Sequence, residues 1–358
     1  MKKIVLTGGG TAGHVTPNIA LLPALQAAGY EIAYVGSYEG IEKKLIADFN
    51  IPYTGISTGK FRRYLDPKNF SDPFRVMKGF VEARNYLKNY QPDVVFSKGG
   101  FVSVPVVRAA ASLHIPCIIH ESDMTPGLAN KLCIPVAEKV CCNFPETMKN
   151  IPADKAVLTG SPIRAELAEG SKLAGLNMCG FTANKPVIMV IGGSLGAANV
   201  NKAVRDALPK LLEDFQVVHL CGKDKIDNLL LNTPGYKQFE YIKAELKDIF
   251  AMADIVISRA GANAICELLA LKKPNILIPL PAASSRGDQL LNAASFEAQG
   301  YSIVLNEDDI TTNLLVDKVH ELYFNRQNYV DAMSKSHQMD AVKTIMELIN
   351  AAAEKKTN

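Results

Sequence analysis

The chain has 358 residues, of which 48% are hydrophobic and 21% are charged, and its formal net charge is +3. This length allows two α/β domains that each fold without disulfides or metals, and the small net charge argues against nucleic acid as a partner. The seven cysteines include no CxxC pair and are odd in number, which argues against a disulfide framework and a zinc site. No run approaches the roughly 20 apolar residues that span a bilayer. We therefore expect a protein that is neither exported nor membrane-spanning.

Short apolar runs, each followed by a glycine or polar turn and a helix-like stretch, predict parallel βαβ units. We expect strands in the first half at 3–6, 31–35, 94–97 and 117–120, and in the second half at 187–191, 216–220, 238–241, 255–258 and 274–278. Gly160 and Pro162 interrupt this pattern and predict a hinge near residue 162. The expected fold class is therefore α/β, with two doubly wound parallel-sheet domains. A helical period from 330 to 353 predicts a terminal helix or helix pair.

Three glycine turns stand at the ends of predicted strands. Residues 8–14, Gly-Gly-Gly-Thr-Ala-Gly-His, fit the GxGxxG spacing between a strand and a helix. Such a helix start presents unpaired N–H groups and a partial positive charge to an anion. A tight turn without a ligand is the alternative for this pattern alone. Further turns at 192–197 and 97–101 favour two phosphate-bearing substrates, one for each domain.

The second strand of the first domain ends in Tyr34-Val35-Gly36-Ser37. A nicotinamide-dependent dehydrogenase normally carries Asp or Glu at this point to bind the ribose hydroxyls. The missing carboxylate argues against a dinucleotide cofactor.

Two positions in the second half could bind a sugar. Glu267, beyond the turn that begins at Arg259, could accept hydrogen bonds from both hydroxyls of a ribose, or could simply complement a helix N-terminus. Asp288 and Gln289 begin a predicted helix and could bind sugar hydroxyls, although such residues are more often solvated.

These blocks together resemble the peptidoglycan N-acetylglucosaminyltransferases of glycosyltransferase family 28, which have the GT-B fold of two Rossmann-like domains facing a cleft. The resemblance covers nearly the whole chain and rests on seven blocks in the same order: residues 9–14, 98–103, 120–123, 160–164, 192–197, 259–267 and 288–289. It implies transfer of N-acetylglucosamine (GlcNAc) from UDP-GlcNAc to the C4 hydroxyl of the N-acetylmuramyl (MurNAc) sugar of lipid I, undecaprenyl-pyrophosphoryl-MurNAc-pentapeptide, with inversion, to give lipid II. It also implies partners among the proteins of cell-wall synthesis.

The resemblance also assigns roles to domains and residues. It implies an acceptor domain at 1–162, on which the C-terminal helix 337–358 packs back, and a donor domain at 163–336. The implied donor-binding residues are Thr11, Ala12, Gly13, Arg164, Ser194, Ile242, Glu267 and Gln289. The implied acceptor and pyrophosphate residues are Gly9, Gly10, Lys98, Gly99, Gly100 and Asp123.

An inverting transfer needs a base for the acceptor proton and stabilisation of the leaving diphosphate. His14 is the candidate base, since a helix N-terminus would lower its pKa; donation to a phosphate is an equal alternative. His120 and Glu121 are alternatives at the acceptor site. The chain contains no Asp-x-Asp pair, so we expect neither an essential metal nor another cofactor.

A lipid acceptor requires contact with a membrane surface. Within 59–88, apolar residues recur at helical spacing with basic residues interleaved. This pattern fits docking on anionic lipid at the cytoplasmic side of the membrane, although an ordinary core helix with a basic face would look similar. The expected docking residues are Phe74, Arg75, Met77, Lys78, Phe80, Val81 and Arg84.

Two other functions are compatible with the same sequence features. A related GT-B enzyme could make a glycolipid from a UDP-sugar and diacylglycerol, sharing much of the donor site. A UDP-sugar epimerase of the same shape would release UDP without any lipid acceptor.

Overall fold

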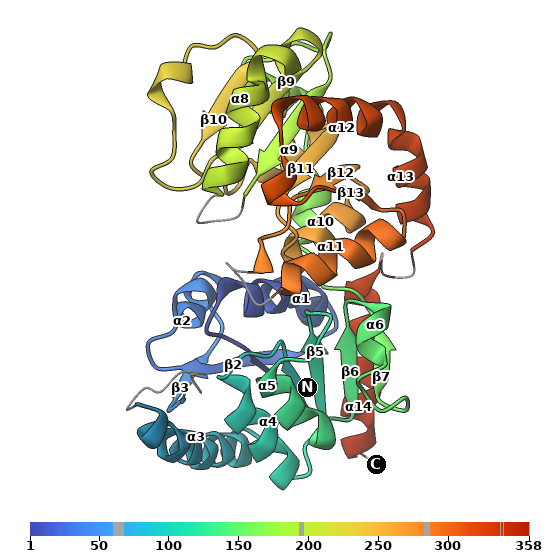
Figure 1. Cartoon of the computed structure of the whole chain (residues 1–358). Coiled ribbons are helices and arrows are strands. Elements are labelled where there is room, and N and C mark those ends of the chain that lie inside the picture. The colour runs from blue at the N-terminus through green and yellow to red at the C-terminus, as the bar shows by residue number, and fades with distance from the viewer. Residues whose placement is uncertain (60–67, 193–196, 283–286, 337, 339, 358) are drawn as a thin grey trace. The chain divides into compact units, whose positions relative to one another are not determined.

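The computed structural model describes residues 1–59, 68–192, 197–282, 287–336, 338 and 340–357. The chain divides into two compact units, unit 1 of Met1–Arg164 with Asp340–Asn358 and unit 2 of Ala165–Met339 (Figure 1). These limits lie two and three residues from the boundaries that we expected after 162 and 336.

Unit 1 is built on a seven-stranded sheet in which every pair of neighbouring strands is parallel, with the order β3-β2-β1-β4-β5-β6-β7. The strands are β1 Lys3–Thr7, β2 Glu31–Ser37, β3 Tyr53–Ile56, β4 Val94–Ser97, β5 Cys117–Glu121, β6 Lys139–Cys142 and β7 Ala156–Leu158. The helices are α1 Thr16–Ala27, α2 Ile41–Ile46, α3 Lys68–Tyr90, α4 Ser103–Ser112, α5 Leu128–Cys133, α6 Pro145–Met148 and α14 Ala341–Thr357.

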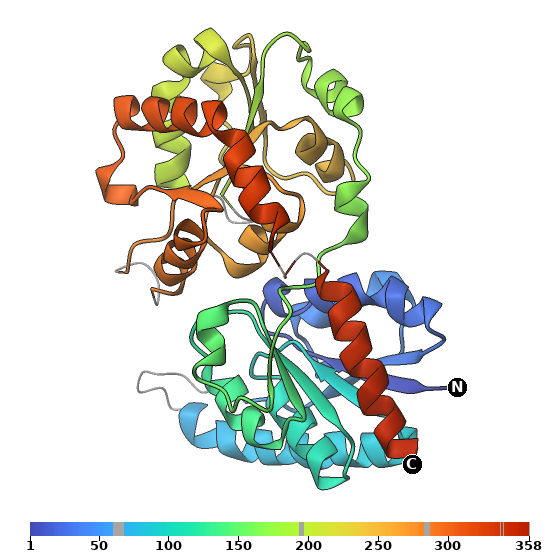
Figure 2. The same ribbon diagram turned by 90° about the vertical axis from the view of Figure 1, so that its right-hand side faces the viewer.

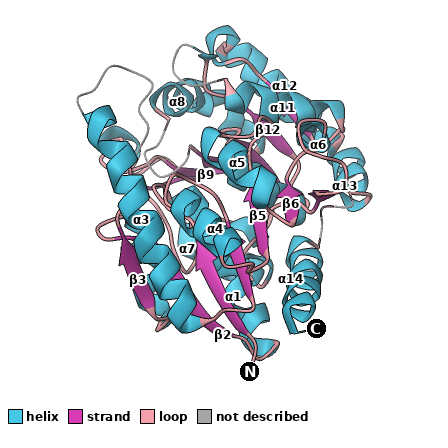
Figure 3. Ribbon diagram, turned by 90° about the horizontal axis from the view of Figure 1, so that it is seen from below, coloured by secondary structure: helices cyan, strands magenta, loops and turns pink. Residues whose placement is uncertain are grey.

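Helices cover both faces of this sheet, because its strands are apolar on both sides. On one face, α3 and α4 lie side by side over a core that includes Val5, Val95 and Ile119 (Figure 3). On the other face, α1 and α14 pack over Ile4, Leu6 and neighbouring side chains (Figure 2). The C-terminal helix α14 thus completes the core of the N-terminal sheet.

Unit 2 has a six-stranded sheet, also parallel at every pairing, with the order β10-β9-β8-β11-β12-β13. Its strands are β8 Val187–Ile191, β9 Gln216–Leu220, β10 Tyr236–Phe239, β11 Ile255–Ser258, β12 Asn275–Leu277 and β13 Ser302–Val304. Its helices are α7 Lys172–Cys179, α8 Ala198–Asp214, α9 Leu246–Met252, α10 Ala262–Ala270, α11 Asp288–Ala298, α12 Thr312–Phe324 and α13 Arg326–Ser334. Helices α8 and α12 pack together over one face, around a core that includes Val204 and Val319.

Most of the expected strands are confirmed, four of them residue for residue: 94–97, 187–191, 216–220 and 255–258. The strand expected at 238–241 begins two residues earlier, at Tyr236, whose ring is buried beyond the Pro234-Gly235 turn. Four strands, β3, β6, β7 and β13, were not predicted from the sequence. Three of them, β3, β7 and β13, are edge strands, which pair on one side only and are marked by less apolar sequence than central strands.

The strand order of each sheet reverses direction at one point. In unit 1 the reversal lies between β1 and β4, and in unit 2 between β8 and β11. Ligands of open parallel sheets bind at the carboxyl ends of the strands at such a switch point. The two predicted glycine turns after β1 and β4 therefore lie at the switch point of unit 1. The third follows β8 in the chain, but its residues 193–196 lie outside the described residues.

Candidate active site

The two glycine turns of unit 1 are packed against each other at the switch point. A Cβ on Gly10 would lie 2.5 Å from the ring of Phe101, and a Cβ on Gly100 would collide with the carbonyl oxygen of Gly9. Gly10, Gly99 and Gly100 also have positive φ, which favours glycine. The turns after β1 and β4 are therefore one structural feature, with Thr11 and Ala12 exposed on it and Gly13 half-buried.

Beneath these turns, Lys98 and His120 form a buried pair. The Nζ atom of Lys98 lies 2.9 Å from Nδ1 of His120 and also bonds Ser122, while Nε2 of His120 lies 2.9 Å from the carbonyl oxygen of Gly160. A carbonyl only accepts, so Nε2 carries the proton and Nδ1 accepts from the ammonium group. Burial, and then the Lys98 charge, hold the pKa of His120 well below its ordinary value.

Glu121 points into the protein as well. Its carboxylate accepts hydrogen bonds from the backbone N–H of Asp123 at 2.9 Å, from that of Gly127 at 2.9 Å, and from the side chain of Asn130 at 2.8 Å. His120 is 0% exposed and Glu121 is 4% exposed. Both side chains, which we expected near an acceptor, thus bond groups of the protein itself and hold the segment after β5, with half-buried Asp123, in place.

His14 ends a short 3-10 turn, Ala12–His14, just before α1. Its Nδ1 atom lies 2.9 Å from the hydroxyl oxygen of Thr11, which orients the ring. Burial is the main cause that lowers the pKa of His14, to about 4; Lys98 lowers it further and Glu42 opposes them. His14 is therefore neutral at pH 7. The main cause of the lowered pKa is burial, whereas we expected it to be the helix N-terminus.

An acid that the sequence analysis did not single out also reaches the first glycine turn. Glu42, the second residue of α2, is fully buried and accepts a hydrogen bond from the N–H of Gly10 at 3.1 Å. No local pattern marks it, since an acid in the first turn of a helix is common.

At the switch point of unit 2, one helix begins after each of the strands β8 and β11. Helix α8 begins at Ala198, and α10 begins at Ala262, directly after Gly261. Ser194, expected at the diphosphate, lies outside the described residues. Two helix N-termini at one switch point form a favourable site for a diphosphate.

A buried ion pair that was not predicted from the sequence lies at the carboxyl ends of the unit 2 strands. The guanidinium of Arg259, directly after β11, pairs with Glu307, and their side chains are only 9% and 7% exposed. Arg259 also donates to the carbonyl oxygens of Ile278 at 3.0 Å and Pro279 at 3.3 Å, and Glu307 accepts from Asn199 of α8 at 2.5 Å. The pair thus connects the segments after β11, β12 and β13 with the first turn of α8.

The other residues expected at the donor lie in different places. Glu267 is half-buried in the second turn of α10, and Ile242 is half-buried after β10. Gln289 is in the first turn of α11, where its side-chain oxygen accepts from the N–H of Leu280 at 3.1 Å. Arg164, expected in the donor half, is the last residue of the first segment of unit 1.

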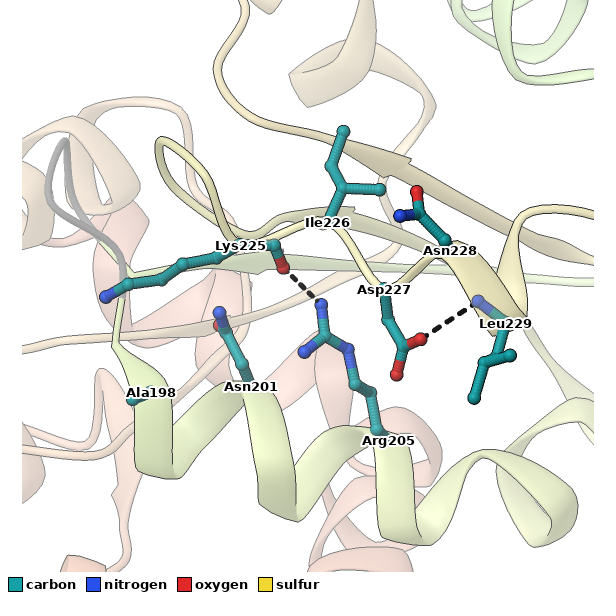
Figure 4. A pocket seen from close by; sticks show the side chains of 8 residues that line it. All are labelled: Ala198, Asn201, Arg205, Lys225, Ile226, Asp227, Asn228 and Leu229. Atoms are coloured by element: carbon teal, nitrogen blue, oxygen red, sulfur yellow. Dashed lines mark hydrogen bonds between the residues drawn. The ribbon is translucent and has the colours of Figure 1, made fainter.

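One pocket, of about 470 Å³, lies between α8 and the segment 225–229 (Figure 4). Arg205 projects from α8 toward this segment and donates to the carbonyl oxygen of Lys225 at 2.6 Å, while Asp227 accepts from the N–H of Leu229 at 3.0 Å. None of the described donor-binding residues lines the pocket. The pocket therefore does not coincide with the residues expected at the donor.

The expected docking residues occupy two sides of α3. Phe74 is 79% exposed and Met77 is 63% exposed, and Val81 is exposed with them. Phe80 instead packs against the core beneath the helix, so it does not belong to the exposed face. The basic residues Arg75, Lys78 and Arg84 are exposed, and Lys78 lies 3.7 Å from Glu82.

The described part of the chain shows neither a cluster of metal-ligand side chains nor a membrane-spanning helix. Among these residues, no group of three or more His, Cys, Asp and Glu side chains is arranged to hold a metal ion. No described helix combines the length and the apolar character needed to cross a membrane.

Two Rossmann-like parallel-sheet units are the architecture of the GT-B fold. The chain belongs to glycosyltransferase family 28: the profile of the family's N-terminal domain matches residues 4–142, and that of its C-terminal domain matches residues 187–349. It is therefore a glycosyltransferase.

Curated relatives carry a specific name. The chain is 65% identical to the UDP-N-acetylglucosamine--N-acetylmuramyl-(pentapeptide) pyrophosphoryl-undecaprenol N-acetylglucosamine transferase of Lachnospira eligens, over 98% of this chain and 99% of that protein. It is also 65% identical to the protein of the same name from Lachnoclostridium phytofermentans, over 98% of each.

Solved structures agree with this family. The crystal structure of Acinetobacter baumannii MurG matches with a TM-score of 0.78 and 29% identity, over 98% of this chain and 100% of that one. The UDP-GlcNAc 2-epimerase of Neisseria meningitidis, bound to UDP-GlcNAc, matches with a TM-score of 0.67 at 15% identity, over 97% and 99%. At that identity the epimerase shows the shared fold alone.

Proposed function

We propose that this glycosyltransferase moves GlcNAc from UDP-GlcNAc to the C4 hydroxyl of the MurNAc sugar of lipid I, forming lipid II for peptidoglycan. The observation that carries the proposal is the 65% identity, over nearly the full length of both chains, to relatives named for this reaction. The same relatives favour this function over diacylglycerol glycosylation and over epimerisation.

In the proposed reaction, the acceptor oxygen attacks the anomeric carbon of GlcNAc on the face opposite to the UDP group. The new C–O bond forms as the bond to the diphosphate oxygen breaks, so the configuration inverts and UDP leaves. His14 takes the proton of the hydroxyl, a role that its neutral form at pH 7 supports. The partial positive charges at the starts of α8 and α10 meet the negative charge of the departing diphosphate.

We assign the UDP-GlcNAc site to unit 2 and the lipid pyrophosphate site to unit 1. Glu267 would bind the ribose, Gln289 the GlcNAc hydroxyls and Ile242 the uracil. Ser194 would bind the diphosphate together with Arg164, which directly precedes the first residue of unit 2. The support for the donor side is that α8 and α10 start at the same switch point. On the acceptor side, the paired glycine turns and Asp123 would meet the lipid pyrophosphate, with Lys98 acting from beneath them.

We further propose that the exposed face of α3 docks on the anionic cytoplasmic surface of the cell membrane, and that proteins of cell-wall synthesis act beside the enzyme there. Phe74, Met77 and Val81 would enter the interface between headgroups and acyl chains, and Arg75 and Arg84 would meet the lipid charge. The exposure of three apolar side chains on one helix, with basic residues interleaved, supports this.

The function is tested by incubating the protein with labelled UDP-GlcNAc and one of three additions: a soluble lipid I analogue, diacylglycerol in vesicles, or no acceptor. We expect labelled disaccharide-lipid with the lipid I analogue alone. Transfer to diacylglycerol would identify a glycolipid synthase. Epimerised sugar without an acceptor would contradict the transferase proposal.

A further inference from the structure

Glu42 is a fully buried acid whose hydrogen-bond donors come from the protein itself. One carboxylate oxygen accepts from the N–H of Gly10 at 3.1 Å. The other accepts from the N–H of Ser37 at 2.9 Å and from the Ser37 hydroxyl. A buried carboxylate is tolerated only with such donors, so their presence explains how the charge is accommodated inside unit 1.

Three glycines, Gly9, Gly36 and Gly40, make the room that the Glu42 side chain fills. A Cβ on Gly9 would lie 2.5 Å from the carboxylate carbon, and a Cβ on Gly36 would lie 2.8 Å from the side-chain Cγ. Gly9 is therefore needed to admit an internal carboxylate, whether or not a phosphate approaches the turn from outside. The second strand carries no acid at its end, but this acid five residues beyond it reaches the glycine turn from within.

The hydrogen bond to Gly10 fixes the part of the turn that leads to His14. The next residue, Thr11, bonds the His14 ring through its hydroxyl, and the carbonyl oxygen of Thr11 accepts from the N–H of His14 at 3.1 Å. The negative charge of Glu42 also acts directly on the imidazole, against the effect of Lys98. Glu42 is thus linked to His14 by contacts through the turn and by charge.

We propose that Glu42 is a positioning residue for glycosyl transfer: its buried carboxylate holds Gly10, and through Thr11 the imidazole of His14, in the conformation that accepts the acceptor proton. The proposal rests on His14 being the base. It predicts that a change at Glu42 lowers kcat and leaves the binding of UDP intact, because the residues assigned to the uracil, the ribose and the diphosphate lie elsewhere in the chain.

The main test is Glu42→Gln in the full-length enzyme. The amide keeps the size of the side chain, but its NH2 group must face either the Gly10 or the Ser37 N–H, so one donor loses its acceptor. We expect kcat with the lipid I analogue to fall by about tenfold to a hundredfold, as small displacements of reacting groups do. The Kd for UDP should stay within about twofold. Glu39→Gln, an exposed acid beside the same loop, is the matched control and should leave kcat unchanged.

A double-mutant cycle separates positioning from a general effect on the fold. If Glu42 acts through His14, Glu42→Gln should cost nothing further in a His14→Ala background. Full additivity, a loss found wholly in the KM of either substrate, or a wild-type kcat in Glu42→Gln would each overturn the proposal. If His14→Ala itself keeps full turnover, the base assignment fails, and that result is distinct from a failure of Glu42 alone.

Ser37→Ala keeps the test decisive if Glu42→Gln does not fold. This change removes one hydroxyl donor from the carboxylate and leaves the backbone N–H of residue 37 in place. We expect a smaller fall in kcat, about threefold to tenfold, with unchanged circular dichroism and an unchanged Kd for UDP. A wild-type kcat in a folded Ser37→Ala enzyme would then overturn the proposal.

Discussion

Replacing Glu307 by Gln should destabilise unit 2 far more than the loss of a surface charge does. The change leaves the Arg259 guanidinium buried without its counter-charge, and removing one partner of a buried ion pair costs about 3–5 kcal/mol. The Gln side chain still offers an oxygen to Arg259 or Asn199, so we expect a value near the lower end, about 3 kcal/mol. Some amide hydrogens exchange only when unit 2 opens. A loss of about 3 kcal/mol in the stability of unit 2 lowers the protection factors of these amides by about a hundredfold.

Hydrogen exchange followed by mass spectrometry suits a two-unit chain, because each peptide reports its own unit. Peptides from β11, β12 and α8 should lose protection, and peptides from β1 in unit 1 serve as an internal reference. Glu321→Gln is the matched control, since Glu321 pairs with Lys318 at 2.6 Å in the same unit but on the surface. An exposed pair of this kind contributes about 0.5 kcal/mol or less. Equal losses in the two variants, or protection within about twofold of wild type in Glu307→Gln, would refute the reasoning.

Three further predictions concern the proposed base, a buried histidine and the membrane surface. His14→Ala should lower turnover by about 10²–10⁴-fold with the Kd for UDP retained, and unchanged turnover would end its assignment as the base. Burial, and then the Arg205 charge, lower the pKa of fully buried His219 to about 3. As the pH falls, the unfolded chain therefore protonates His219 before the folded chain does, and unit 2 should lose stability from about pH 6.5 toward pH 3. Hydrogen exchange in β9 measures this loss. A His219→Asn variant should show a weaker dependence of stability on pH, and an equal dependence would refute His219 as the cause. Changing Phe74 and Met77 to Ser should weaken binding to anionic vesicles by about tenfold or more and leave turnover of a soluble acceptor unchanged. The control Leu229→Ser, at an exposed site in unit 2, should change neither quantity. Equal vesicle binding by the two variants would count against docking by α3.

The sequence by itself determined the class of fold and the points along the chain where ligands are expected. Strand, glycine turn and helix start are local signals, and each is visible within about ten residues. The strands at 94–97 and 255–258 were therefore predicted to the residue. The seven blocks that carried the family resemblance likewise needed no knowledge of which segments lie together in space.

Only the tertiary structure decided which side chains face the turns and which face the interior. His120 and Glu121 stand at a strand end, yet the partners that bury them come from Lys98 and Gly160 in one case and from Asn130 in the other. Glu42 and the pair of Arg259 and Glu307 gave no local signal, because their importance depends on groups brought close by strand order. Burial of a charge is a property of the packed molecule, and it is burial that makes these residues structurally important.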